Sequence, residues 1–108
     1  RHLILFLSLC AAACGTVCDS AVGAQRRAND KGRDCSHQNI AVADANRCNS
    51  GLSKCSPDDV KELQAYADCL DALPVCSSSN STSWAFSRAG CQLQPIGRVS
   101  GECAGAIF

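Results

Sequence analysis

The sequence is poor in aromatic side chains and carries no net charge. Aromatic residues make up 5% of its 108 residues, and ten Lys and Arg balance ten Asp and Glu. This balance leaves no basic surface to hold nucleic acid, so we expect no nucleic-acid partner. A single small domain with so few large apolar side chains has a marginal core, and we expect covalent cross-links to stabilise it.

The motifs that indicate a catalytic or cofactor-binding protein are also lacking. The sequence contains no Cys-x-x-Cys, no Gly-x-Ser-x-Gly and no Gly-x-x-x-x-Gly-Lys, which excludes the usual thiol-redox, paired zinc-knuckle, haem-attachment, nucleophile-elbow and phosphate-loop patterns. His37 lies close to Cys35 and offers a metal pair, but a surface histidine beside a cross-linked cysteine is the more frequent arrangement. Asp58 and Asp59 are adjacent acids at a predicted helix start, where carboxylates usually cap. We therefore predict no enzyme activity, no catalytic residue, no metal site and no cofactor.

What the sequence has in excess is cysteine, with ten among 108 residues. Such a density in a short chain is typical of a disulfide scaffold. Arg1 and His2 precede an apolar run that ends in Ala11-Ala12-Ala13, which is the pattern of a secretory leader. The run is too short for a transmembrane helix, which needs about 20 apolar residues. We therefore predict a signal peptide and an oxidising destination.

Two kinds of cleavage fit the leader, and they leave different numbers of cysteines. A cut after Ala24, or a dibasic cut after Arg27, leaves seven cysteines, and an odd number requires a free or intermolecular thiol. The segment before Cys14 resembles a bacterial lipobox, although Ala11 stands where Leu is usual. Cleavage there removes a signal peptide of residues 1–13 and consumes Cys14 in a diacylglyceryl thioether.

The eight remaining cysteines close into four disulfides, so we favour the lipobox cut and lipidation of Cys14. We predict a membrane partner through that lipid anchor and one disulfide-stapled helical domain over residues 14–108. The spacing of the cysteines does not show which of them pair with each other. The sequence does not identify a protein partner. The cysteines predicted to be oxidised are Cys18, Cys35, Cys48, Cys55, Cys69, Cys76, Cys91 and Cys103.

Apolar periodicity predicts a small, mostly α, disulfide-rich fold. About three short helices are expected, over residues 18–31, 56–73 and 82–93, with irregular connections. We interpret residues 33–54 as a loop held by disulfides, and the glycine-containing tail after Ile96 as irregular. The stripe of the first helix consists of Cys18, Ala21, Val22, Gln25 and Ala28.

The central helix carries the clearest local signal, Ser-Pro-Asp-Asp at residues 56–59. Serine caps a helix, proline fits its first position, and acids suit its positive end. An apolar stripe follows at three- and four-residue steps, made of Val60, Leu63, Tyr66, Ala67, Leu70 and Leu73. Cys69 is expected at the edge of the core.

In the third helix, Trp84 and Phe86 are two residues apart, and so cannot share one narrow helical stripe. One of them is expected to be buried and the other to be partly exposed. Gly90 and Pro95 are expected to limit this helix.

Four cysteine-containing segments carry a likeness to a known family. They are Ala-Ala-Ala-Cys14-Gly-Thr-Val-Cys18-Asp, Lys54-Cys55-Ser-Pro-Asp-Asp, Tyr66-Ala-Asp-Cys69-Leu-Asp-Ala-Leu-Pro-Val-Cys76 and Val99-Ser-Gly-Glu-Cys103. Together they resemble small cysteine-rich predicted lipoproteins of the myxobacterial type. This resemblance implies a bacterial cell-envelope lipoprotein, anchored outside the cytoplasm, with a non-catalytic binding or structural role. Fungal small secreted cysteine-rich proteins are similar in composition and imply instead a free extracellular effector-like protein, cleaved after Ala24 or Arg27.

Overall fold

The computed structural model describes residues 16–108. The predicted signal peptide and the predicted lipidation site at Cys14 lie outside this range. Within it the chain forms five α-helices and one short 3₁₀ helix, and it contains no strand. The helices are α2 (Val17–Lys31), α3 (Ala45–Gly51), the 3₁₀ helix η1 (Leu52–Lys54), α4 (Pro57–Asp71), α5 (Ser81–Gly97) and α6 (Gly101–Ile107).

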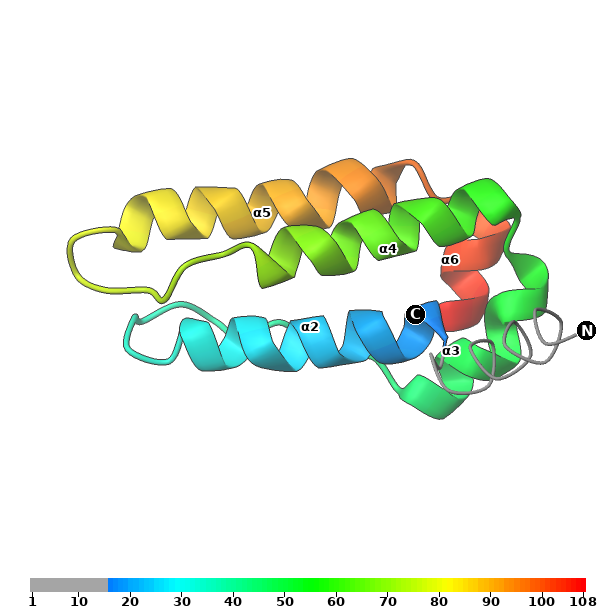
Figure 1. The fold of residues 1–108 in the computed structure, drawn as a ribbon, viewed down its shortest axis with the longest axis horizontal. Helices are drawn as coiled ribbons and strands as arrows, with labels where there is room; N and C mark the ends of the chain where they lie inside the picture. Colours follow the sequence, from blue (N-terminus) through cyan, green and yellow to red (C-terminus); the bar gives the residue numbers. More distant parts are fainter. Residues whose placement is uncertain (1–15) are drawn as a thin grey trace, which may run out of the picture.

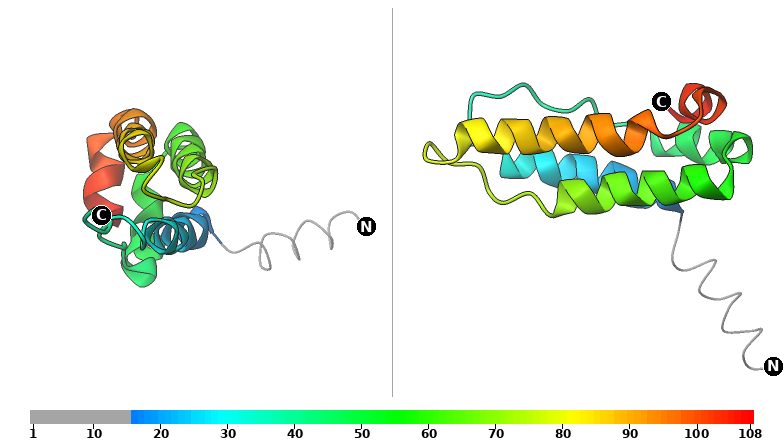
Figure 2. Two further views of the ribbon diagram at one scale, coloured as in Figure 1. Left: turned by 90° about the vertical axis from the view of Figure 1, so that its left-hand side faces the viewer. Right: turned by 90° about the horizontal axis from the view of Figure 1, so that it is seen from above.

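The three long helices α2, α4 and α5 lie side by side, and α4 packs against both of the others (Figure 1). Seen along their axes, they stand at the corners of a triangle (Figure 2). The short helices α3 and α6 pack on each other at one end of this bundle. The segment between α2 and α3, which we call the strap (residues 33–44), returns along the outside of the bundle (Figure 2).

The first two long helices begin with the same local device, a capping box. The Ser56 hydroxyl accepts from the Asp59 backbone N–H at 3.1 Å, and the Asp59 carboxylate accepts from the Ser56 N–H at 3.0 Å. Thr16 and Asp19 make the equivalent pair at the start of α2. Each pair satisfies backbone donors that the first turn of a helix leaves free. The interpretation of Asp59 as a cap is therefore confirmed.

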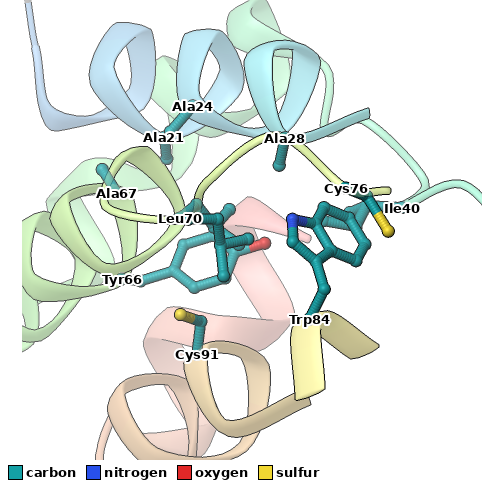
Figure 3. Close-up of a cluster of buried hydrophobic side chains, with 11 residues drawn as sticks. Ala21, Ala24, Ala28, Ile40, Tyr66, Ala67, Leu70, Cys76, Trp84 and Cys91 are labelled. Atoms are coloured by element: carbon teal, nitrogen blue, oxygen red, sulfur yellow. The ribbon is translucent and has the colours of Figure 1, made fainter. Parts of the chain in front are cut away.

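The core sets small side chains of α2 against large ones of α4 and α5 (Figure 3). Trp84 is 2% exposed, and its indole N–H donates to the Pro74 carbonyl at 2.7 Å. A Cβ at Gly32 would lie 2.6 Å from the Trp84 ring, so only glycine fits the end of α2. Phe86 is 75% exposed, and Cys69 is half-buried against the cluster. The expectations for Trp84, Phe86 and Cys69 are confirmed.

The expected apolar stripe of α4 is correct except in its first turn. Val60 is 36% exposed, whereas Asp59 is buried. Asp59 lies four residues before the fully buried Leu63, so it takes the inward position that we assigned to Val60. There its carboxylate accepts two hydrogen bonds from Ser100.

The number of helices is larger than the expected three, because residues 33–54 are not all loop. Residues Ala45–Gly51 form α3 and Leu52–Lys54 form η1. Asp44 caps α3 by accepting from the N–H groups of Asn46 and Arg47. Cys48 anchors α3 in a second core cluster, which consists of Cys18, Cys48, Leu63, Val99, Cys103 and Ile107. A helix of two turns has too few residues to show periodicity, and it depends on such tertiary support.

The tail is also helical, and the expectation of an irregular tail was wrong. Ser100 caps α6 by accepting from the Cys103 N–H at 3.2 Å. Cys103 and Ile107 are buried in the second cluster, against α3 and Leu63. These contacts stabilise a seven-residue helix in spite of its low intrinsic propensity.

The third long helix continues beyond its predicted end at residue 93. It runs through Pro95 to Gly97, and Pro95 is buried. Its backbone nitrogen cannot donate to the carbonyl of Cys91, four residues earlier, so the helix loses one hydrogen bond there. Burial of the proline ring in the bundle offsets part of this loss.

Substitution of Leu70 tests the apolar face of α4. Leu70 is 0% exposed, so Leu70→Ala should lower the free energy of unfolding by about 2–5 kcal/mol. Asp68→Ala, on the exposed face of the same helix, should change it by less than about 0.5 kcal/mol. Urea denaturation of the oxidised proteins measures both values. Equal losses from the two substitutions would contradict the assignment of faces.

Candidate functional site

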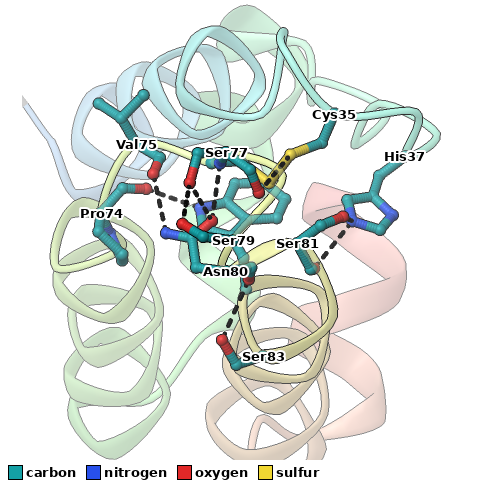
Figure 4. The surroundings of a disulfide bond; sticks show 11 residues. Cys35, His37, Pro74, Val75, Ser77, Ser79, Asn80, Ser81 and Ser83 are labelled. Atoms are coloured by element: carbon teal, nitrogen blue, oxygen red, sulfur yellow. Dashed lines mark hydrogen bonds between the residues drawn. A yellow bond between two sulfur atoms is a disulfide. The ribbon is translucent and has the colours of Figure 1, made fainter.

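Four disulfides connect the elements that surround the candidate site. Cys18–Cys48 joins α2 to α3, and Cys69–Cys91 joins α4 to α5. Cys55–Cys103 ties the start of α4 to α6, and Cys35–Cys76 links two connections at the far end of the bundle (Figure 4). All eight cysteines expected to be oxidised are thus paired within the chain.

A cavity, which we call the strap groove, has a volume of about 490 Å³. It lies between the strap and the side chains of α2, α4 and α5. Its apolar lining comes from Ile40, Ala41, Val42, Ala43, Ile96 and Phe108. Its polar lining comes from Gln25, Asp44, Arg47, Tyr66 and Gln92. An apolar cavity of this size with a few polar groups is the usual form of a small-molecule site.

Two amide side chains of α2 hold the strap in place. Gln25 is 3% exposed and accepts from the Ala43 N–H at 2.8 Å. Asn29 accepts from the Ile40 N–H at 2.8 Å and donates to the Ile40 carbonyl at 2.9 Å. The strap backbone therefore finds its partners on α2 rather than in a strand or helix, and one wall of the groove is fixed.

Tyr66 supplies a hydrogen-bond donor to the groove. Its hydroxyl oxygen accepts from the Gln25 amide at 3.0 Å, and within residues 16–108 no acceptor is paired with its proton. Burial raises the pKa of the Tyr66 hydroxyl, an effect that the Gln25 hydrogen bond only opposes in part. The hydroxyl therefore keeps its proton at neutral pH and remains able to donate to a ligand.

The charged residues that line the groove are Asp44 and Arg47, at the start of α3. The Asp44 carboxylate is engaged as the cap of α3. The Arg47 guanidinium donates to the Gly105 carbonyl at 3.4 Å and takes no part in either ion pair found among residues 16–108. The groove therefore offers two donors, Tyr66 and Arg47, to a ligand with an accepting head group.

The sequence did not predict this site. Gln25 was placed on the apolar stripe of its helix, and a buried amide in such a stripe is the signal that a polar partner lies opposite. That partner, the strap backbone, was interpreted as part of a loop. Nothing in the spacing of the strap residues indicates which helix they contact.

Two clusters contain residues of the metal-binding types. Cys35, His37 and Cys76 form one, and Cys55, Asp59 and Cys103 form the other, with the ligand atoms of each within 4.8 Å of one another. All four cysteines are in disulfides, and metals bind the free thiolate. In the oxidised protein these sulfur atoms are therefore engaged in covalent cross-links rather than free as ligands.

His37 has structural partners instead. Its Nε2 lies 2.9 Å from the Ser81 hydroxyl (Figure 4), and its ring stacks on Trp84 with centroids 5.9 Å apart. It therefore covers the core at the start of α5. It is half-buried, not a free surface histidine.

The chain has no match among protein-family models, curated proteins or solved structures. The likeness to myxobacterial lipoproteins therefore stays a prediction. None of the helices within residues 16–108 combines the length and apolar character that crossing a bilayer requires.

Acid titration tests the Asp59 junction between α4 and α6. Hydrogen bonds from Ser100 and Ser56 hold the pKa of the Asp59 carboxyl below its ordinary value of 3.8. Because the folded state favours the carboxylate, this stabilisation is complete above the unfolded pKa and is lost as the pH falls through the folded pKa. Asp59→Asn should therefore lower the melting temperature at pH 7, and the difference from the parent protein should shrink below about pH 4.

The neighbouring Asp58 provides the control for this titration. Asp58 is exposed at the same helix start, so Asp58→Asn should have little effect at either pH. A deficit of Asp59→Asn that is independent of pH would show that the charge of Asp59 does not stabilise the junction.

Proposed function

We propose that this chain is a lipid-anchored protein of a bacterial cell envelope. It is held outside the cytoplasm through Cys14, and its helical domain binds a small amphipathic ligand without transforming it. The observation that carries the proposal is the disulfide between Cys18 and Cys48. The free secreted form, cleaved after Ala24 or Arg27, is the alternative.

The four disulfides support a location outside the cytoplasm. Disulfides persist in oxidising compartments and are rare where thiols are kept reduced. With eight cysteines paired within residues 16–108, the disulfide pairing has no need of Cys14. This arrangement leaves Cys14 available for a thioether.

Cleavage after Ala24 would divide a folded helix. Helix α2 runs without interruption from Val17 to Lys31, and Ala24 is 0% exposed at its centre. The cut would remove Cys18 and leave Cys48 without its partner. It would also remove the capping box at the start of the helix.

The dibasic alternative meets the same obstacle. Arg27 lies in the same helix, and its guanidinium donates twice to the Asp71 carboxylate, at 2.7 and 3.0 Å. A protease requires an extended segment, whereas this site is helical and tied to α4. The lipobox cut, by contrast, falls before Thr16, where the capped helix begins.

The short spacing between Cys14 and Cys18 determines how the anchored domain would lie. Three residues separate these cysteines, which spans at most roughly 14 Å at about 3.5 Å per residue. A lipoprotein cysteine carries two or three acyl chains, which attach it far more firmly than a single chain. The domain would therefore rest on the membrane surface.

Substitution of Cys14 tests the anchor. The native protein should enter the detergent phase on phase partitioning, and its intact mass should include the acyl chains and four disulfides. Cys14→Ser should block both lipidation and cleavage before residue 14. Cys10→Ser is the matched control, because Cys10 lies in the leader that is removed, and the mature product should be unchanged. An aqueous product that begins at Gln25 or Ala28 would contradict the proposal.

The strap groove supports a binding role. Its walls are mainly apolar, and Tyr66 and Arg47 present donors to its interior and rim. Its volume of about 490 Å³ lies within the range of roughly 300–1,000 Å³ that is typical of ligand sites. A molecule with an apolar body and an accepting head group fits this arrangement.

A titration with decanoate and decanol, followed by amide NMR, tests the groove. Both probes should shift signals of residues 40–44, Gln92 and Ile96. Arg47→Gln should weaken decanoate binding by about ten-fold, the effect of one lost charge-assisted hydrogen bond, and leave decanol nearly unaffected. Val60→Ala, an exposed change outside the groove, is the control. Shifts confined to other surfaces, or none at saturating probe, would contradict a ligand site here.

A further inference from the structure

Helix α5 presents an apolar face that nothing in the described chain covers. Phe86 is 75% exposed and Leu93 is 73% exposed, the largest fractions among the exposed large apolar residues of 16–108. They are seven residues apart, which places them on the same side of a helix. Gly90 and Gly97 lie on the same side of the helix, because the order Phe86, Gly90, Leu93 and Gly97 advances by four, three and four residues.

No packing among residues 16–108 requires a glycine at position 90. An added Cβ at Gly90 or at Gly97 would meet no atom of these residues within 4 Å. Glycine destabilises a helix interior relative to alanine, and Gly90 lies in the middle of α5. At Gly32, by contrast, the Trp84 ring fills the space that a side chain would need. The open space over Gly90 is therefore suited to a side chain of another molecule.

The face also lacks charge. Arg88 is the one charged residue between Ser81 and Gly97. Its guanidinium is turned away, over the Trp84 ring at 5.5 Å and toward the Gln38 carbonyl. Helices that lie in a membrane surface usually carry Lys and Arg beside their apolar face. Their absence here favours a protein surface of the same uncharged kind.

The order of large and small residues on this face is self-complementary. A twofold axis that runs between two antiparallel α5 helices, level with the midpoint of residues 91 and 92, places Phe86 opposite Gly97 of a second copy, and Leu93 opposite Gly90 of that copy. By the same symmetry, Gly97 and Gly90 of the first copy lie opposite Phe86 and Leu93 of the second. Each large side chain thus meets the space over a glycine, as an isologous interface requires. A parallel pairing in the same register would set Phe86 against Phe86 and glycine against glycine.

We propose that the Phe86–Gly90–Leu93–Gly97 face of α5 is the interface of an antiparallel homodimer. In this register α5 of each copy overlaps α5 of the other over residues 86–97, about 18 Å of helix at about 1.5 Å per residue. We expect so short a contact to bury less than the roughly 1,200 Å² of a stable complex, and therefore a weak dimer, with a dissociation constant in about the micromolar range. The proposal is independent of the lipid anchor and of the groove.

Sedimentation equilibrium of the mature, oxidised protein over about 1–500 µM tests the dimer. If the protein carries acyl chains, a detergent density-matched to the solvent removes the micelle contribution. Phe86→Glu and Leu93→Glu should each weaken dimerisation by at least about ten-fold. Val75→Glu is the matched control, since Val75 is 64% exposed but lies outside α5. Circular dichroism confirms that each variant is folded.

A mixing experiment tests the register. Gly90→Arg and Leu93→Glu should each weaken the homodimer, whereas an equimolar mixture should regain a heterodimer, because the introduced arginine of one copy then faces the introduced glutamate of the other. Gly90→Ala should raise the melting temperature at low concentration and still weaken dimerisation, a combination that a purely structural role for this glycine would not give.

Three results would overturn the proposal. One is a monomer throughout the concentration range. Another is a dimer that Phe86→Glu and Leu93→Glu leave intact. The third is a monomer that binds phosphatidylglycerol vesicles through Phe86 and Leu93, which would assign this face to a lipid surface.

Discussion

The contact between α2 and α4 rests on Ala21, Ala24 and Ala28, three small side chains that let the two helices lie close together. Burial of apolar area contributes roughly 25 cal/mol per Å², and an alanine buries little. Disulfides that restrict the unfolded chain contribute roughly 2–4 kcal/mol each. Three of the four attach parts that lie outside the three-helix bundle, namely α3, α6 and the two connections at its far end. The positions of the groove and of the short helices therefore depend on covalent links.

Much of the bundle could be predicted from the sequence, since α2, α4 and α5 each have at least 15 residues and α2 and α4 carry a clear apolar stripe. The cap at residues 56–59 is a local signal and needs no tertiary information. The short helices differ, because Asp44 and Ser100 are visible as caps only once Cys48 and Cys103 are known to be buried. Cys48 and Cys103 are buried because they form disulfides with Cys18 and Cys55, and the spacing of the cysteines in the sequence does not show these pairs.

The candidate groove could not be predicted for a related reason. It exists because Gln25 and Asn29, both on α2, bind the strap backbone at Ala43 and Ile40. These are long-range contacts between a helix and a segment without periodicity. The sequence shows a glutamine within an apolar stripe, which indicates that a polar partner exists but not where it lies. The residue types thus indicate the core but not the cavity beside it.

Helix α5 contributes to both proposed surfaces, and its rotation about its own axis is fixed at three points. The Cys69–Cys91 disulfide ties it to α4, the Trp84 indole donates to Pro74, and the Arg88 guanidinium donates to the Gln38 carbonyl. Gln92 and Ile96 consequently line the groove, while Phe86 and Leu93 are exposed.

A rotation of α5 would move residues on both surfaces, because adjacent positions on a helix differ by about 100°. A ligand that shifted Ile96 would therefore disturb the Leu93 face as well. The disulfide opposes such a rotation. The geometry thus favours two surfaces that act independently, on a helix held in one orientation by a covalent bond and two hydrogen bonds.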